Sequence, residues 1–275
     1  MTDSGFAARY RQAVDTRGRL CAGIDPHAEL LAQWGLPVSV DGLARFAEVC
    51  AEALGPVAAV IKPQVAFFEA FGSGGFAVLE ETIRRCRELG ALVLADAKRG
   101  DIGTTMAAYA HAWLDDTSPL CSDAVTASPY LGFESLRPAL DAARRSDRGV
   151  FVLARTSNPE GVGVQLADTG AGFVAQSMVD AAAAENGEGV TVGLVVGATR
   201  NHGLDLSGFT APILAPGLGA QGATPSDLPA VFYGAHLRWV LPASSRGVLR
   251  HGPDVVTLRA ACEQTIDEVE AALSR

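Results

Sequence analysis

Eight short apolar runs, separated by stretches of helical periodicity, constrain the fold of this chain more than any other feature of its sequence. Apolar residues follow one another almost without interruption in each run, which is typical of strands buried on both faces of a parallel sheet. The predicted strands are Arg19–Ile24, Val57–Lys62, Ala91–Asp96, Ala124–Ser128, Val150–Arg155, Thr191–Val196, Pro212–Pro216 and Leu237–Pro242.

Most of the segments between these runs repeat apolar residues at intervals of three and four, which predicts helices. They are Asp41–Leu54, Gly75–Leu89, Thr104–Asp116, Gly132–Arg145, Gly170–Glu185, Pro225–Ala235 and Asp254–Leu273. Because the gap between the sixth and seventh runs is short, we expect only a small helix there. An extra helix over Ser4–Thr16 precedes the first strand and is expected to cover the bottom or the flank of the fold.

Eight strand–helix units in 275 residues predict an α/β fold of the (β/α)₈ TIM-barrel type. A doubly wound open sheet is the alternative, but the Gly-rich dinucleotide fingerprint is missing after the first run, where GIDPHAELL stands instead. We find no repeat, low-complexity tract or Pro/Ser-rich linker. We therefore expect one domain over residues 1–275.

Charge and hydropathy exclude several function classes. With 31 acidic and 22 basic residues the formal net charge is −9, whereas a general nucleic-acid binder needs an excess of Lys and Arg. The longest apolar runs fall far short of the roughly 20 residues of a membrane-spanning helix. The first residues lack the apolar core of a signal peptide. We expect neither nucleic acid nor a membrane as a partner.

Cysteine and histidine usage argues against a metal site. The five cysteines are scattered without a Cys-x-x-Cys pair, and no histidine lies three or four residues from another. Buried thiols in a reducing cytoplasm explain this distribution better than a disulfide or zinc framework. We expect a cytoplasmic protein without a bound metal.

Charged and polar residues are rare inside the apolar runs but gather where the runs end. In a barrel these ends meet at one face, which carries the active site in enzymes of this fold. The segment LADAKRGDIGTT, after the third run, is the centre of this group. The sequence therefore predicts an active site at the carboxyl ends of the strands.

Asp96 and Lys98 are two residues apart, so a strand that continues through them directs both side chains into the barrel. Asp101 follows in the loop, at the expected start of a helix. A structural ion pair and a helix N-cap are the competing interpretation of these three residues. Lys62, at the end of another run, favours a functional interpretation of these residues. Two lysines and two aspartates in one cavity have no net charge together, so each of the four groups can stay ionised.

A Gly-rich loop, APGLGAQGATP, follows the seventh run, and Ser-Ser-Arg-Gly follows the eighth. Barrel enzymes frequently bind a phosphate with these two loops. Glycines allow backbone N–H groups to approach the anion, and Arg246 adds a charged donor. The alternative interpretation is that the Gly-rich loop is only a turn and binds no ligand.

Two other groups of residues are weaker candidates. Asp25 and His27, together with Asp96, form a thin ligand set for a metal. Ser157 and Ser128 lack an adjacent base, which disfavours a Ser-His-Asp hydrolase.

The run from Asp96 to Thr105 resembles the D-x-K-x-x-D-I signature of orotidine 5′-phosphate decarboxylases. The resemblance extends over nearly the whole chain, through GIDP, IKPQ, ARTSNPEG, PGLGAQG and the Ser-Ser-Arg near the eighth run. It is similar to the longer (type 2) subgroup of that family. The resemblance implies a lyase without a cofactor that converts orotidine 5′-monophosphate to uridine 5′-monophosphate (UMP) and CO₂, the last step of de novo UMP synthesis. It also implies a homodimer with shared active sites.

The resemblance further implies a role for each matching residue. Lys98 corresponds to the donor of a proton to C6 of the pyrimidine, and Asp96 and Lys62 hold Lys98 and the ribose hydroxyls. Asp101 corresponds to a residue that enters the partner subunit's site, and Ile102 and Thr105 complete the shared wall.

The substrate-binding positions match in the same way. Asp25 is similar to the family's ribose-binding aspartate, and Ser157 to the serine at the pyrimidine edge. Gln221, followed by Gly222, and Arg246 match the phosphate-binding loops. Ser-Ser precedes Arg246, where compact members carry a glycine, so the fine geometry of the phosphate contact departs from theirs.

Two other functions remain open. A sugar-phosphate lyase of the same barrel superfamily, of the hexulose-phosphate synthase or keto-gulonate-phosphate decarboxylase type, shares the D-x-K-x-x-D array and uses Mg²⁺. Ser157 and Gln221 favour a nucleotide over a linear sugar. A barrel that only binds a phosphate ligand is the second alternative, but it has no need of an ammonium group enclosed by carboxylates.

Overall fold

The computed structural model describes residues 5–170, 172–187, 192–199, 202–219 and 222–274. Eight parallel strands form a closed barrel in the order β1 to β8 along the chain, with β8 pairing back to β1. The strands are β1 Cys21–Ile24, β2 Val60–Pro63, β3 Leu92–Arg99, β4 Ala124–Ala127, β5 Gly149–Arg155, β6 Val192–Val196, β7 Ile213–Pro216 and β8 Val240–Ser244. The prediction of an α/β TIM barrel is confirmed.

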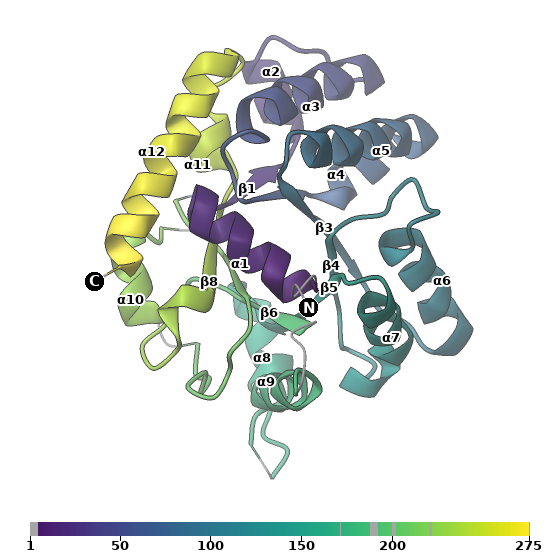
Figure 1. The fold of residues 1–275 in the computed structure, drawn as a ribbon, viewed down its shortest axis with the longest axis vertical. Coiled ribbons are helices and arrows are strands. Elements are labelled where there is room, and N and C mark those ends of the chain that lie inside the picture. The colour runs from purple at the N-terminus through teal and green to yellow at the C-terminus, as the bar shows by residue number, and fades with distance from the viewer. Residues whose placement is uncertain (1–4, 171, 188–191, 200–201, 220–221, 275) are drawn as a thin grey trace.

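Helices surround this barrel (Figure 1). The α-helices are α1 Phe6–Arg17, α2 Ala28–Gln33, α3 Val40–Leu54, α4 Val65–Glu69, α5 Gly72–Glu88, α6 Gly103–Leu114, α7 Arg137–Arg145, α8 Val162–Gln165, α9 Val174–Glu185, α10 Leu228–Val231, α11 Arg246–Leu249 and α12 Val255–Leu273. Single 3₁₀ turns are η1 Phe133–Leu136, η2 Pro159–Gly161, η3 Pro225–Asp227 and η4 Leu237–Trp239. No described helix is both long and apolar enough to cross a lipid bilayer.

The predicted small helix between the sixth and seventh strands is wrong for the described part of that segment. Residues 197–199 and 202–212 form turns, bends and irregular chain, without a helix. Leu206 and Phe209 are buried there and cover the barrel without helical structure. The expected eighth strand also begins later than predicted, because Leu237–Trp239 form the 3₁₀ turn η4.

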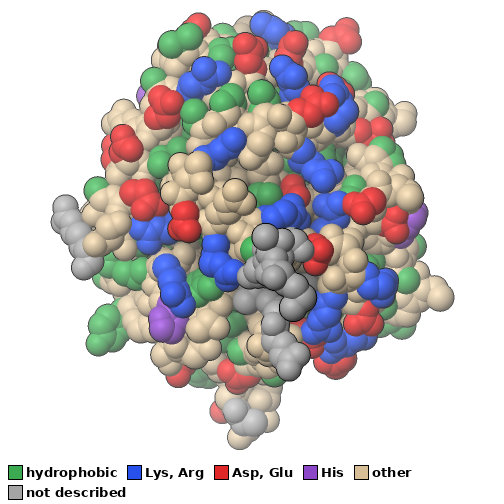
Figure 2. Space-filling view, viewed as in Figure 1, with side chains coloured by type: hydrophobic (Ala, Val, Ile, Leu, Met, Phe, Trp, Pro, Cys, Tyr) green, Lys and Arg blue, Asp and Glu red, His purple; other side chains and the backbone are tan. Residues whose placement is uncertain are grey.

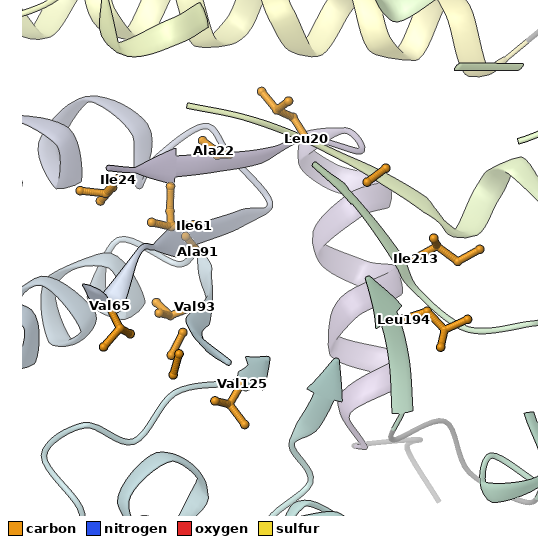
Figure 3. Packing of buried hydrophobic residues seen from close by; sticks show 14 of the residues in the cluster. Leu20, Ala22, Ile24, Ile61, Val65, Ala91, Val93, Val125, Leu194 and Ile213 are labelled. Carbon is orange, nitrogen blue, oxygen red and sulfur yellow. The ribbon is translucent and has the colours of Figure 1, made fainter. Parts of the chain in front are cut away.

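The strands bury both of their faces because their side chains alternate between two hydrophobic clusters. The outward-facing side chains pack against the helices, and Figure 3 shows several of them, among them Ile61, Val93 and Leu194. The inward-facing side chains, such as Leu94 and Phe151, fill the lower part of the barrel. This division explains why the runs in the sequence are continuous rather than alternating.

The N-terminal helix α1 lies across the ring of strands (Figure 1). Its residues Phe6, Tyr10 and Val14 belong to the same cluster as the inward-facing strand residues. Phe6 contacts Phe151 edge-on, with the ring centroids 6.2 Å apart. The helix therefore closes the amino end of the barrel, which is one of the two positions that the sequence left open, and it leaves the carboxyl end free for a site.

Acidic and basic side chains are interspersed over the face crossed by α1 (Figure 2). At this end, Asp123 pairs with Arg9 and with Arg148. Because both signs of charge are mixed, this face does not resemble the basic surface of a nucleic-acid-binding protein.

Candidate active site

A cavity of about 340 Å³ lies at the carboxyl ends of the strands. Its floor is apolar and is formed by Leu153, Val195 and Leu214, whose side chains also belong to the cluster inside the barrel. Its walls carry polar and charged residues from most of the strand ends and the loops that follow. They include Asp25, His27, Lys62, Gln64, Asp96, Lys98, Thr156, Ser157, Asn158, Ser245 and Arg246.

Asp96, in the second half of β3, is the centre of the hydrogen-bond network in this cavity. Its Oδ1 accepts hydrogen bonds from Lys98 Nζ at 2.7 Å and from Thr126 Oγ1 at 2.9 Å. Its Oδ2 accepts from Lys62 Nζ at 3.1 Å and from Gln64 Nε2 at 2.8 Å. Only 7% of the residue is exposed. Four donors, two of them cationic, compensate for the burial of this carboxylate.

Lys62, from β2, lies between two carboxylates. Besides its contact with Asp96, its Nζ is 3.8 Å from Asp25 Oδ1 at the end of β1. Lys98 extends the series on the other side of Asp96, so positive and negative groups alternate across the cavity wall. Within one chain, therefore, the second aspartate of the array is Asp25 and not Asp101, which the sequence predicted for this position.

The two most buried groups of this array hold their charges. Burial lowers the pKa of Lys62, but the charges of Asp25 and Asp96 outweigh this effect, so the pKa lies above its ordinary value. Burial likewise raises the pKa of Asp96, but Lys62 and Lys98 outweigh it, and the pKa lies below its ordinary value. An ammonium group and a carboxylate thus persist at neutral pH in a largely buried site.

Asp101 lies outside the cavity of its own chain. Its carboxylate accepts a hydrogen bond from the adjacent Ile102 N, and among the described residues it is absent from the cavity wall. Ile102 is 62% exposed, and Thr105 is exposed at the start of α6. These three residues form part of the outer surface beside the cavity mouth.

Ser157 lines the cavity from the loop after β5. Gly197 directly follows the neighbouring β6, and a Cβ atom there would lie 2.9 Å from Ser157 N. Glycine at this position therefore lets the serine loop approach the mouth of the barrel. Gln165 fastens the other side of this loop, because its Oε1 accepts from Thr156 N at 3.0 Å and from Arg155 Nη1 at 2.9 Å.

Arg246 lines the opposite part of the cavity, at the first residue of α11 after β8. Ser245, beside it, packs on β1, where a Cβ atom on Gly23 would overlap its side chain. Gln221 lies outside the described residues. Gly222 has a φ of 88°, a left-handed conformation that glycine favours, but it is not among the residues that line this cavity.

Sequence reasoning missed two residues of this site, Gln64 and Thr126, and considered His27 only as part of a thin metal-ligand set. Gln64 follows Lys62 by two positions and donates to Asp96, so strand alternation was the available signal. Thr126 is a polar side chain inside an apolar run, which is itself a signal of an inward-facing contact. His27 lines the cavity mouth, with its ring centroid 4.2 Å from that of Phe67.

The described residues contain no group of three or more His, Cys, Asp or Glu side chains arranged to hold a metal ion. Asp25, His27 and Asp96, which the sequence suggested as a thin ligand set, all line the cavity without forming such a group.

Residues 18–261 match the model of the orotidine 5′-phosphate decarboxylase / HUMPS family. The chain belongs to this family. Two curated relatives are orotidine 5′-phosphate decarboxylases, from Streptomyces coelicolor and from Salinispora arenicola. Each is 56% identical, and each match covers 98% of this chain and 98% of the relative. These full-length relatives favour the decarboxylase over the sugar-phosphate lyase that the sequence left open.

Solved structures agree with this assignment. A crystal structure of a candidate orotidine 5′-phosphate decarboxylase from Streptomyces avermitilis is 56% identical, with a TM-score of 0.93 over 100% of this chain and 98% of that one. The OMP decarboxylase of Leishmania donovani is 31% identical, with a TM-score of 0.81 over 98% of this chain and 100% of that one. The barrel fold of this chain is therefore shared with both of these proteins.

Proposed function

We propose that Lys98 protonates C6 of the pyrimidine while this enzyme converts orotidine 5′-monophosphate to UMP and CO₂. This reaction is the last step of de novo UMP synthesis. The observation that carries the proposal is the alternating array of Asp25, Lys62, Asp96 and Lys98 on one wall of the cavity.

Loss of CO₂ leaves negative charge on a ring carbon, and the proposed reaction uses no cofactor to absorb it. A preorganised ammonium group stabilises charge that develops beside it and then supplies a proton. Asp96 supports this role for Lys98, because its Oδ1 is 2.7 Å from Lys98 Nζ and fixes the direction of the ammonium group. Lys62 holds the other oxygen of Asp96 and so limits its rotation.

The proposed binding roles of Asp25, Ser157 and Arg246 follow the positions of these residues in the cavity wall. Asp25 Oδ1 is buried without a hydrogen-bond partner among the described residues, which makes it available to the ribose hydroxyls. Ser157 faces the pyrimidine edge. Arg246 binds the phosphate together with Gln221 and Gly222, since the loops after β7 and β8 hold the phosphate in many barrel enzymes.

We further propose a homodimer in which Asp101, Ile102 and Thr105 complete the partner's site. Ile102 lies in the loop after β3, and the loop after β4 carries two other exposed apolar side chains, Tyr130 at 80% and Leu131 at 55%. The two loops are adjacent, since Ser128 N donates to Arg99 O at 2.8 Å. Such an exposed apolar surface is typical of a protein interface.

Two further statements rest on the remaining observations. We propose a cytoplasmic location, because all five cysteines are buried free thiols, as in proteins of reducing compartments. We propose a single domain over residues 1–275, because α1 packs against the side chains that fill the barrel and Arg19 pairs with Glu270 of α12.

The test is the loss of orotidine 5′-monophosphate absorbance with wild-type protein and with Lys98→Ala, each assayed with and without EDTA. We expect wild-type activity to survive EDTA. We expect Lys98→Ala to abolish turnover and leave the Kd of the product UMP within about tenfold, since the main partner of the lysine is the developing carbanion. Normal turnover by Lys98→Ala would refute the proposed role. Dependence of the wild type on Mg²⁺ would favour the sugar-phosphate lyase.

A further inference from the structure

The pairing between β3 and β4 is interrupted at the proposed proton donor. Ala95 pairs with Val125, and Arg99 pairs with Ala127, so three residues of β3 face Thr126 alone. Lys98 has a φ of 47° in this bulge, and among the described non-glycine residues only Asp147 shares a positive φ. A bulge redirects side chains, and such a backbone conformation persists only where its surroundings hold it.

The Thr126 hydroxyl supplies the interactions that the interrupted ladder lacks. Its Oγ1 accepts a hydrogen bond from Lys98 N at 2.9 Å. The same hydroxyl donates to Asp96 Oδ1, also at 2.9 Å. Because Asp96 Oδ1 in turn accepts from Lys98 Nζ, one hydroxyl is connected to both ends of the lysine.

Thr126 is 1% exposed and lies behind Asp96, outside the set of described residues that line the cavity. It therefore reaches a substrate only through Lys98 and Asp96. We propose that Thr126 is a positioning residue, whose hydroxyl fixes the bulge of β3 and thereby the place of the Lys98 ammonium group. This inference rests on the proposed role of Lys98.

The direct test replaces the hydroxyl and leaves the shape of the side chain. Thr126→Val keeps the β-branched form that suits a strand but leaves Lys98 N without its acceptor and Asp96 Oδ1 without one donor. A displacement of about 1 Å can cost about 100-fold in rate, so we expect kcat to fall by roughly 10- to 100-fold. The Kd of UMP and the KM are expected to stay within about threefold, because the binding residues are unchanged.

Two variants distinguish the effect of the Thr126 hydroxyl group from the effect of side-chain packing. Thr126→Ser keeps the hydroxyl without the methyl group, and we expect its kcat to stay within about threefold of the wild type. Thr82→Val is the matched control on α5, since Thr82 is also buried and its hydroxyl donates to Val78 O, far from the cavity in the fold. Its kcat is expected to equal that of the wild type.

A kcat of Thr126→Val within threefold of the wild type would overturn the inference. So would an equal loss in Thr126→Ser, which would assign the effect to the methyl group, or a rise in KM at unchanged kcat. If Thr126→Val does not fold, Thr126→Ala decides, because it removes the hydroxyl without adding an atom. Lys98→Ala, assayed in parallel, distinguishes the two proposals: if it is inactive while Thr126→Val is normal, only the role of Thr126 fails.

Discussion

Asp96→Asn tests the central assumption about the site, which is that the carboxylate is held by charge on both of its oxygens. In the wild type each oxygen accepts two hydrogen bonds, one of them from a lysine. An asparagine has one acceptor oxygen, and its NH₂ group only donates. Whichever way the amide turns, its NH₂ faces either Lys98 Nζ and the Thr126 hydroxyl or Lys62 Nζ and the Gln64 amide.

The expected loss of stability follows from the burial of Lys62. Lys62 is 5% exposed, and in the variant its one remaining charged partner among the described residues is Asp25, at 3.8 Å. Removing one partner of a buried ion pair typically costs about 3–5 kcal/mol. At about 2–4 °C for each kcal/mol in a chain of roughly this size, we expect Tm to fall by about 6–20 °C. Urea unfolding at pH 7 measures the free energy directly.

The pH dependence follows from the direction of the pKa shift of Asp96, which is downward on folding. A carboxylate of this kind stabilises the folded state above its unfolded pKa of about 3.9, and the stabilisation is lost as the pH falls through the lower folded value. The difference between the wild type and Asp96→Asn is therefore expected to stay constant between about pH 5 and pH 8 and to shrink below about pH 4.

Glu81→Gln is the control, because Glu81 pairs with Arg84 on the exposed surface of α5. An exposed pair contributes at most about 1 kcal/mol. If Asp96→Asn loses no more free energy of unfolding than this control, the carboxylate is not held by its cationic partners, and the account of the array is refuted.

Two further predictions concern the phosphate and the assembly. Arg246→Ala removes a charged hydrogen bond worth about 1.5–3 kcal/mol, so kcat/KM is expected to fall by roughly 10- to 100-fold, and a wild-type value in steady-state kinetics would remove Arg246 from the phosphate site. Inactive Lys98→Ala and inactive Asp101→Ala proteins, mixed under conditions of subunit exchange, are expected to regain part of the activity through heterodimers that carry one intact site. No recovery despite exchange would mean that each site is built from one chain.

The strands were predictable because the apolar character that allows both of their faces to be buried is visible in the sequence. A strand that is covered on its inner face by α1 or by side chains, and on its outer face by helices, has no polar side, so Val192–Val196 is apolar throughout. The segment before β7 lacked such a signal. Its buried residues Leu206 and Phe209 belong to a loop, and a loop has no regular spacing of apolar residues that a sequence could reveal.

The residues of the site were predictable where they lie at or near the carboxyl ends of the strands. Asp96 and Lys98 meet because they belong to one strand, and Lys62 reaches them from the neighbouring one. The position of Asp101 was not predictable from spacing, because a residue in a loop can face its own cavity or the surface. The link through Thr126 depends on a bulge between β3 and β4, and regular alternation contains no signal for it.

The two lysines of the array differ in a way that decides which of them can act. Lys62 is 5% exposed, lies between two carboxylates and has a raised pKa, so it retains its proton. The side chain of Lys98 is 44% exposed and is held on one side only, by Asp96. Under the proposed mechanism the donor loses a proton in each turnover and must regain one from solvent. Only the more exposed lysine meets both requirements, so in the proposed mechanism Lys62 holds Asp96 and Lys98 transfers the proton.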